Sequence, residues 1–212
     1  MELIITEENL HLLSQYNNNV KVLKASGVDL KTLDLTNFPA LTHLECDNNY
    51  LTSLDCTPCL RLRHLMCSNN NLTHLNVERC GSLQQLDCSE NELTDLALPQ
   101  SICLKFLDCS SNKIEELWLE RCIELETLYC SSNKIREIRF RISPKLKDVF
   151  CSDNNLKTIN VSKLPNIENL YFSGNNIRSL DLSECLKLKE VAYPKKSGIK
   201  LPDIQGFKAF SV

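Results

Sequence analysis

The chain has 212 residues, 42% of them hydrophobic and 24% charged, and a formal net charge of -3. This composition is that of an ordinary globular protein and excludes a disordered chain, and no apolar stretch approaches the ~18–20 residues of a membrane span. The small net charge gives no indication of a nucleic-acid or membrane partner. The 12 cysteines are unusual for this length, and their spacing decides how they are interpreted.

The first residues predict a cap at one end of the fold. They carry glutamates where a signal peptide would carry positive charge, and their apolar residues are interrupted, so we expect a soluble, cytoplasmic chain. Residues 6–16 predict a short amphipathic helix with Thr6 as its N-cap and with Leu10 and Leu13 facing inward. We therefore expect residues 1–19 to form an N-terminal helical cap.

A period of 21 residues runs through most of the chain. Each unit reads L-x-x-L-x-C-x-x-N-x-L-x-x-L-x-L, with a degenerate first copy that begins at Val20 and a half copy that ends at Tyr193. The asparagines of the unit are Asn49, Asn70, Asn91, Asn112, Asn133, Asn154 and Asn175. Internal repetition at this spacing indicates a solenoid. We expect each asparagine amide to satisfy backbone groups that would otherwise be buried without a partner.

These motifs resemble the leucine-rich-repeat family over about residues 20–193, and the unit is similar to the short repeats of bacterial members. The alternation at Leu44 and Cys46 independently predicts a short strand with one face inward, and equivalent strands should stack as a parallel sheet. The resemblance places this sheet on a concave face. The second half of each unit is too short for a regular helix, which predicts short strands or 3-10 turns on the convex side.

The ends of such a solenoid need covers. We expect one domain over residues 1–212, with about eight repeats over 20–193 and a C-terminal cap over 194–212. The apolar residues of this last segment, which we expect to act as a lid over the final repeat, are Ile199, Leu201, Ile204, Phe207 and Phe210.

Most cysteines fall on two columns of the repeat. The first column holds Cys46, Cys67, Cys88, Cys109, Cys130 and Cys151, and the second holds Cys59, Cys80, Cys122 and Cys185. Core packing is the favoured interpretation, because free cysteine behaves as a small buried hydrophobe. Disulfides along a column are disfavoured, since neighbouring parallel strands hold Cβ atoms ~4.8 Å apart and a disulfide needs ~3.8 Å. A reduced column favours the cytosol.

Two chemical alternatives for the cysteines stay open. Cys56 and Cys59 have zinc-like spacing, and His64 and Cys67 follow them. Cys103 lies off the repeat pattern and is the candidate for a nucleophile, although no histidine lies near it in sequence. A carboxylate pair, Asp87 and Asp108 with His64, would be a third route to catalysis, but an open sheet offers no pocket that excludes water.

The outward positions of the repeated strand predict a binding surface. An acidic half is followed by an aromatic half, and clustered exposed aromatic residues usually mark an interaction surface. The alternatives are that the C-terminal cap covers these aromatic residues or that they only pair across strands. The candidate partner-binding residues are Glu45, Met66, Asp87, Phe106, Asp108, Tyr129, Phe150 and Tyr171.

Basic residues of the convex side could form a nucleic-acid patch. They are Arg136, Arg139, Arg141, Lys145 and Lys147. The register argues against this, because Glu115, Trp118 and Glu120 lie one repeat before the three arginines and should pair with them.

We therefore expect a monomeric, non-enzymatic protein-binding module that uses its concave face, needs no cofactor or metal, and binds neither nucleic acid nor membrane. Its expected partner is another protein, in particular an enzyme with a basic surface, which it inhibits or regulates. The resemblance implies a secreted bacterial effector, or an inhibitor of one, that acts in the cytoplasm, including the host cytosol after secretion. The alternative is an enzyme or sensor that relies on a cysteine or zinc site.

Overall fold

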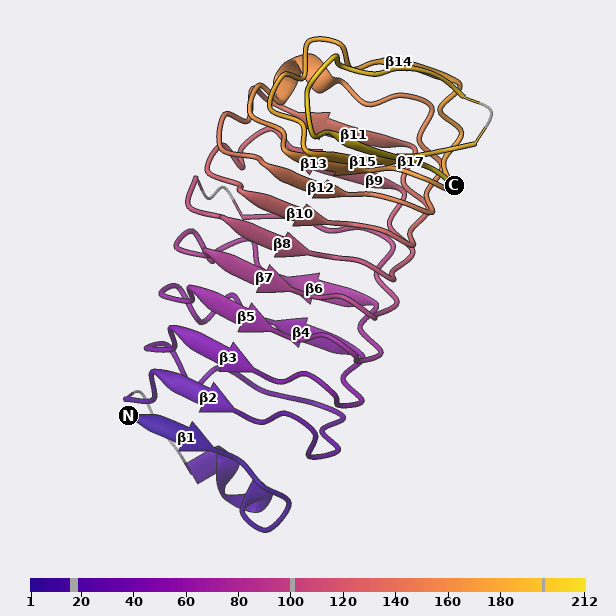
Figure 1. The fold of residues 1–212 in the computed structure, drawn as a ribbon. Helices are drawn as coiled ribbons and strands as arrows, with labels where there is room; N and C mark the ends of the chain where they lie inside the picture. Colours follow the sequence, from indigo (N-terminus) through magenta and orange to yellow (C-terminus); the bar gives the residue numbers. More distant parts are fainter. Residues whose placement is uncertain (16–18, 100–101, 196) are drawn as a thin grey trace.

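The computed structural model describes residues 1–15, 19–99, 102–195 and 197–212. The chain winds into a solenoid whose turns stack in sequence order from one end to the other (Figure 1). The turns contribute short strands to one parallel sheet of 11 strands, whose outward surface is the concave face. In spatial order these strands are β1 (Glu2–Ile4), β2 (Val22–Lys24), β3 (His43–Glu45), β5 (His64–Met66), β7 (Gln85–Asp87), β8 (Phe106–Asp108), β10 (Thr127–Tyr129), β12 (Asp148–Phe150), β13 (Asn169–Tyr171), β15 (Glu190–Tyr193) and β17 (Lys208–Ser211). The predicted parallel solenoid is confirmed.

The convex side carries short strands and turns, as predicted. Its strands form three parallel pairs, which are β4 (Ser53–Asp55) with β6 (His74–Asn76), β9 (Glu116–Leu119) with β11 (Glu137–Phe140), and β14 (Ser179–Asp181) with β16 (Gly198–Lys200). Two 3-10 helices complete the elements, η1 (Leu10–Gln15) and η2 (Val161–Lys163). Among the described residues, no helix has the length and apolar character that crossing a bilayer requires.

The 21-residue period fixes the register of the sheet. Leu44 pairs with Leu65 and Glu45 with Met66, so equivalent residues of successive repeats lie side by side. The middle residue of each repeat strand is fully or almost fully buried, and its two neighbours on the strand are half-buried. Burying one leucine contributes ~1.5–3 kcal/mol, and each turn covers the apolar face of the next, so the turns stabilise one another.

The asparagine column joins adjacent turns, as predicted. The side-chain oxygen of Asn112 accepts a hydrogen bond from Leu93 N at 2.9 Å, and its amide nitrogen donates to Cys88 O at 3.0 Å and to Cys109 O at 3.2 Å. The other asparagines of the column form the same bonds, and five of the seven are at most 8% exposed. One side chain thus satisfies backbone groups of two turns that water cannot reach.

Replacing one of these asparagines should therefore destabilise the whole stack. We expect Asn112→Ala to lower the free energy of unfolding by about 2–4 kcal/mol, because Leu93 N and Cys88 O lose their partner while they stay buried. Urea unfolding of both proteins would measure the difference. Asn71 follows a column asparagine in the chain but is exposed, so Asn71→Ala is the control. We expect it to change the free energy of unfolding by no more than about 0.5 kcal/mol. Equal effects of the two changes would contradict this role of the column.

The N-terminal segment differs from the predicted helical cap. β1 comes first and extends the sheet by pairing with β2, because Leu3 and Ile5 alternate with outward residues and are buried. The backbone N–H of Thr6 donates to Asn9 Oδ1 at 2.8 Å, so the asparagine side chain closes this turn, and the helix begins only at Leu10. The remaining residues form the short 3-10 helix η1, which suits a segment too short for a stable α-helix.

Part of the N-terminal prediction does hold. Leu10 and Leu13 pack against the core, as expected for a cap. The end of the predicted helix, Tyr16, lies outside the described residues.

The C-terminal segment forms a further turn beside the last repeat, and it does not fold over the concave face. β16 pairs with β14 and β17 pairs with β15, so both sides of the solenoid continue. Ile199, Leu201 and Phe207 pack against the core, as expected. Phe210 is 46% exposed, so its predicted place in an apolar lid is wrong. It pairs with Ala192 and thereby extends the concave column that contains Tyr171.

Candidate functional site

Seven of the eight candidate binding residues lie on the concave face in one line across the sheet. Each is half-buried, so its side chain is held by its neighbours and still contacts solvent. Phe106 lies beside the line, two residues before Asp108 on β8. In the order of the paired strands the line contains Glu45, Met66, Asp87, Asp108, Tyr129, Phe150 and Tyr171.

The aromatic half of this line is a continuous stack. The rings of Tyr129 and Phe150 have centroids 4.5 Å apart and an angle of 7°, and those of Phe150 and Tyr171 are 4.8 Å apart at 22°. Phe106 contacts Tyr129 at 5.8 Å with a tilt of 48°. The separations follow from the ~4.8 Å spacing of the strands, which is also a favourable distance for ring contacts. The aromatic residues therefore pair across strands, and each stays only half-buried, so part of its surface contacts solvent.

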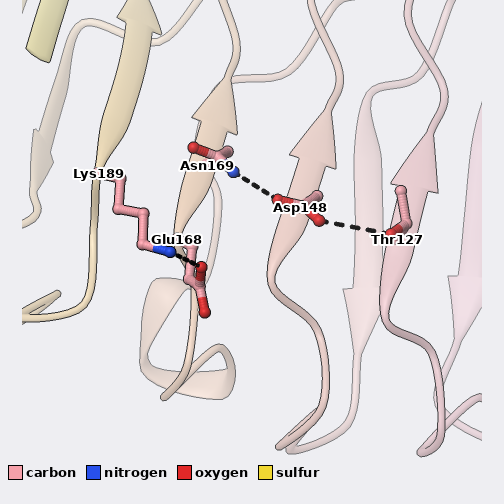
Figure 2. Close-up of polar contacts among 5 residues, drawn as sticks. All are labelled: Thr127, Asp148, Glu168, Asn169 and Lys189. Atoms are coloured by element: carbon pink, nitrogen blue, oxygen red, sulfur yellow. Dashed lines mark hydrogen bonds and ion pairs between the residues drawn. The ribbon is translucent and has the colours of Figure 1, made fainter.

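A row of polar side chains crosses three neighbouring strands (Figure 2), and each of its residues lies two positions before an aromatic residue of the stack. Asp148 accepts a hydrogen bond from Asn169 Nδ2 at 2.6 Å and one from Thr127 Oγ1 at 3.5 Å, which links β10, β12 and β13. Figure 2 also shows the ion pair between Lys189 and Glu168 at the start of the neighbouring strands. The alternation along each strand puts Thr127, Asp148 and Asn169 in the column beside the stack, but the sequence does not show that their side chains bond to one another. Together they form a polar rim, a common surrounding of an apolar interface centre.

The last aromatic residue of the line is tied to this rim. The hydroxyl of Tyr171 donates to Glu190 Oε2 at 2.5 Å. This bond to a carboxylate is the main reason that the pKa of Tyr171 rises to about 12. Glu190 in turn contacts Lys208 of the last strand at 3.1 Å. Both Glu190 and Lys208 belong to the site by position, and neither is among the candidate residues of the sequence analysis. Glu190 lies in the final half copy of the repeat, and Lys208 lies in the segment expected to form a lid.

The acidic half of the line places like charges on neighbouring strands. Asp87 lies opposite Asp108, and each accepts a hydrogen bond from the backbone two residues further on. Burial raises the pKa of the Asp108 carboxyl, and the charges of Asp87 and Glu90 raise it further. The ionised form of Asp108 is therefore unfavourable for the fold, and a basic partner beside it would relieve that cost.

This cost predicts a pH-dependent effect of Asp108→Asn. The pKa of Asp108 is higher in the folded protein than in the unfolded chain. The contribution of this carboxyl to the stability of the fold is therefore fully present below the ordinary carboxyl pKa, and it is lost as the pH rises through the raised pKa. The amide keeps an oxygen for Ser110 N and carries no charge. We expect Asp108→Asn to raise the Tm by about 2 °C or more at pH 7, with the difference vanishing near pH ~3.

Asp181 provides a control of opposite sign. Bonds from Ser183 and Lys200 lower the pKa of its carboxyl to about 2, so its charge stabilises the fold at all pH values above the ordinary carboxyl range. Asp181→Asn should therefore lower the Tm at pH 7. Thermal scans from pH 3 to 8 would compare the variants, and a lower Tm for Asp108→Asn at pH 7 would contradict the assignment.

The cysteine columns are part of the core. All cysteines except Cys103 are buried, and Cys103 is half-buried. Burial raises the pKa of Cys80 and Cys122 to about 11 and that of Cys59 and Cys151 to about 12. These thiols stay protonated at neutral pH, whereas nucleophiles and metal ligands act as thiolates.

The residues of the zinc hypothesis do not meet. Cys56 and Cys59 are fully buried, and the thiol of Cys59 donates to Phe38 O at 3.5 Å. His64 lies on the concave face instead, where its ring stacks on His43 at 4.4 Å and contacts Gln85 at 3.2 Å. In the part of the chain that the structure describes, no three His, Cys, Asp or Glu side chains are grouped in a way that could hold a metal ion.

Thiol chemistry tests the packing interpretation. In the native protein we expect the buried thiols to resist alkylation at neutral pH, and after unfolding without reductant nearly all 12 should titrate. Cys109→Ser should destabilise the protein by about 1–3 kcal/mol, because it places a hydroxyl in the middle of the column. Mass spectrometry that found disulfides between Cys88, Cys109 and Cys130 would disprove the interpretation.

The charges of the convex side largely pair as the register predicts. Arg136 and Glu115 form an ion pair at 3.0 Å, and the guanidinium of Arg139 lies 4.3 Å from the ring centre of Trp118. The third expected pair, Arg141 with Glu120, does not form among the described residues. Lys145 instead pairs with Glu124 at 2.6 Å. Lys147 forms no ion pair within the described ranges.

Comparison with known proteins agrees with this architecture. No protein-family model and no curated protein matches the chain. Among solved structures, the functional domain of InlJ from Listeria monocytogenes, which includes a cysteine ladder, is similar over 92% of this chain, with 30% identity and a TM-score of 0.81. YopM, a leucine-rich effector protein from Yersinia pestis, is similar over 87%, with 24% identity and a TM-score of 0.62. Internalin C2 from Listeria monocytogenes is similar over 89%, with 21% identity and a TM-score of 0.67.

The chain is therefore a leucine-rich-repeat protein, and its repeats are of the short bacterial type. The InlJ domain includes a cysteine ladder, and this chain likewise carries buried cysteines on successive turns. The chain spans 45% of the InlJ chain, 62% of the YopM chain and 84% of the internalin C2 chain.

Proposed function

We propose that this chain is a non-enzymatic protein-binding module that holds its partner on the concave face. The observation that carries the proposal is the stack of Tyr129, Phe150 and Tyr171 in line with the carboxylates of Asp87 and Asp108. Aromatic side chains supply the large buried area that anchors an interface, and their stacking holds them in place before the partner arrives. Nearby carboxylates steer a basic partner and set its orientation.

The partner that fits this surface has a basic rim beside an apolar protrusion. The protrusion would cover the aromatic stack, and the basic rim would face Glu45, Asp87 and Asp108. An enzyme whose active-site mouth has these features would be blocked by the binding, so we propose inhibition or regulation as the outcome. The module would act as a monomer, because the proposed surface requires no second copy.

The setting we propose is that of a secreted bacterial effector, or an inhibitor of one, that works in the cytoplasm of a host cell. The likeness to the effector protein YopM supports this setting, although at 24% identity the likeness concerns the fold. The cysteine columns fit a reducing compartment, since buried thiols need no oxidised partner to stabilise the core.

Single substitutions in the aromatic stack test the proposal. The partner would be captured with the wild-type protein, and its affinity for each variant then measured by surface plasmon resonance. Because these side chains face away from the core, Tyr129→Ala, Phe150→Ala and Tyr171→Ala should leave the solenoid folded. At least one should weaken binding by about 2 kcal/mol or more. Asp87→Asn combined with Asp108→Asn should act mainly on the association rate and its salt dependence.

Trp118→Ala is the matched control, because it removes an aromatic side chain that is 52% exposed on the convex side. This change should cost little affinity for a partner held on the concave face. If all three concave variants bind normally and Trp118→Ala does not, the concave face is not the binding surface for this partner.

A further inference from the structure

The convex side is interrupted between β6 and β9. Residues 95–97 lie 21 positions after β6 and 21 before Glu116, so the repeat places a strand there, yet they form none. Pro99 occupies the position of Glu78 and Glu120 in the neighbouring repeats. Because proline has no N–H and restricts the residue before it, it disfavours a regular strand at this point.

The interruption leaves one edge of β9 without a partner strand. Where convex strands of neighbouring turns pair, backbone bonds join the turns. Cys56 N donates to Asn76 O at 2.9 Å, and Arg136 N donates to Glu115 O at 2.9 Å. Over the described ranges, the equivalent bonds from Leu98 N to Trp118 O and from Glu115 N to Thr94 O are not formed. β9 therefore pairs with β11 on one side only.

A second interruption on the same side shows that a missing strand need not open the stack. Residues 158–160 also form no strand, but η2 follows them directly. There Ser143 N donates to Lys163 O at 2.8 Å and Val161 packs against the core, so the turn after β11 is still bonded to the next one. Within the described ranges, residues 94–99 themselves form no backbone hydrogen bond to the next turn.

A cavity of about 700 Å³ lies at the open interruption. Residues 94–99 form one wall, and β9 with the residues that follow it forms the other. Leu96 and Leu98 line it with apolar surface. The carboxylates of Asp95, Glu116 and Glu120 also line it, against one arginine, Arg121.

The shape and chemistry of this opening fit an extended polypeptide. The free edge of β9 offers unpaired backbone groups, which another strand can satisfy. Along β9 the side chains of Glu116 and Trp118 are exposed and those of Leu117 and Leu119 are buried. A strand added beside β9 would follow the same alternation, with one set of side chains on the apolar lining and the other beside the carboxylates.

The charge of the cavity indicates which side chains of the added strand would lie beside the carboxylates. Glu115 is already paired with Arg136 and does not count as free charge, but Asp95, Glu116 and Glu120 outnumber Arg121. Trp118 lines the cavity while Arg139 covers part of its ring, so this tryptophan already contacts one cation. Basic side chains on the added strand would thus complement the carboxylates of the cavity.

We propose that this opening is a second binding site, at which an extended segment of a partner protein, with alternating basic and apolar residues, pairs with the free edge of β9. The site lies on the convex side and does not depend on the concave aromatic stack.

An eight-residue peptide of alternating lysine and valine, blocked at both ends, is the probe. The chain contains one tryptophan, Trp118, so the emission of the protein reports on this site directly. We expect a saturable change of emission with the peptide. A version with methylated backbone nitrogens on one strand edge should bind at least about tenfold more weakly, because it cannot complete the strand pairing. A peptide with glutamate in place of lysine should not bind.

Variants locate the site and decide between outcomes. Glu116→Gln combined with Glu120→Gln should weaken the peptide about tenfold, whereas Tyr129→Ala on the concave face should leave its affinity unchanged. Three results would overturn the proposal: no saturable change at peptide concentrations up to ~1 mM, equal binding of the methylated peptide, or loss of binding with Tyr129→Ala. Equal binding of the methylated peptide would show attraction by charge alone. Loss with Tyr129→Ala would place the peptide on the concave face.

Discussion

The hydrogen-bonded spacing between parallel turns, ~4.8 Å, is the constraint from which the other features of this protein follow. The asparagine column holds that spacing by bonding to two turns at once. The same distance is favourable for aromatic rings, unfavourable for two carboxylates and too long for a disulfide. The same placement therefore has three different results. Tyr129 and Phe150 form a stack, the thiols of the core stay reduced, and the charge of Asp87 adds to the rise in the pKa of Asp108 that burial causes.

The repeat made most of the fold predictable, and the ends show where that reasoning stopped. Within the repeat, the position of a residue in the unit gives its direction, so the buried columns and the concave line could be named from the sequence. Leu3 and Phe210 lie outside any full copy of the unit, and short apolar segments there are compatible with a strand, a helix or a lid. The structure decides in favour of strands, because the exposed edge of the sheet is completed by pairing.

The candidate site was predictable in position but not in its interactions. The sequence placed Asp148 and Asn169 beside the aromatic residues, but rotamers decide that these two side chains bond to each other. Likewise, the bond from Tyr171 to Glu190 depends on the last turns of the chain, where the repeat is incomplete. The interruption at residues 95–97 had one sequence signal, Pro99 in place of a glutamate, but the cavity beside it depends on hydrogen bonds that no sequence pattern reports.

The cysteine columns have a consequence for the way the solenoid opens. From Cys46 to Cys151, six successive turns carry a thiol at the same buried position, so each of these turns contains its own chemical reporter of exposure. In a stack where each turn contacts only its neighbours, opening can begin at an end and progress inward. The rate at which each thiol of the column becomes reactive would then give the order in which the turns separate, without any label added to the chain.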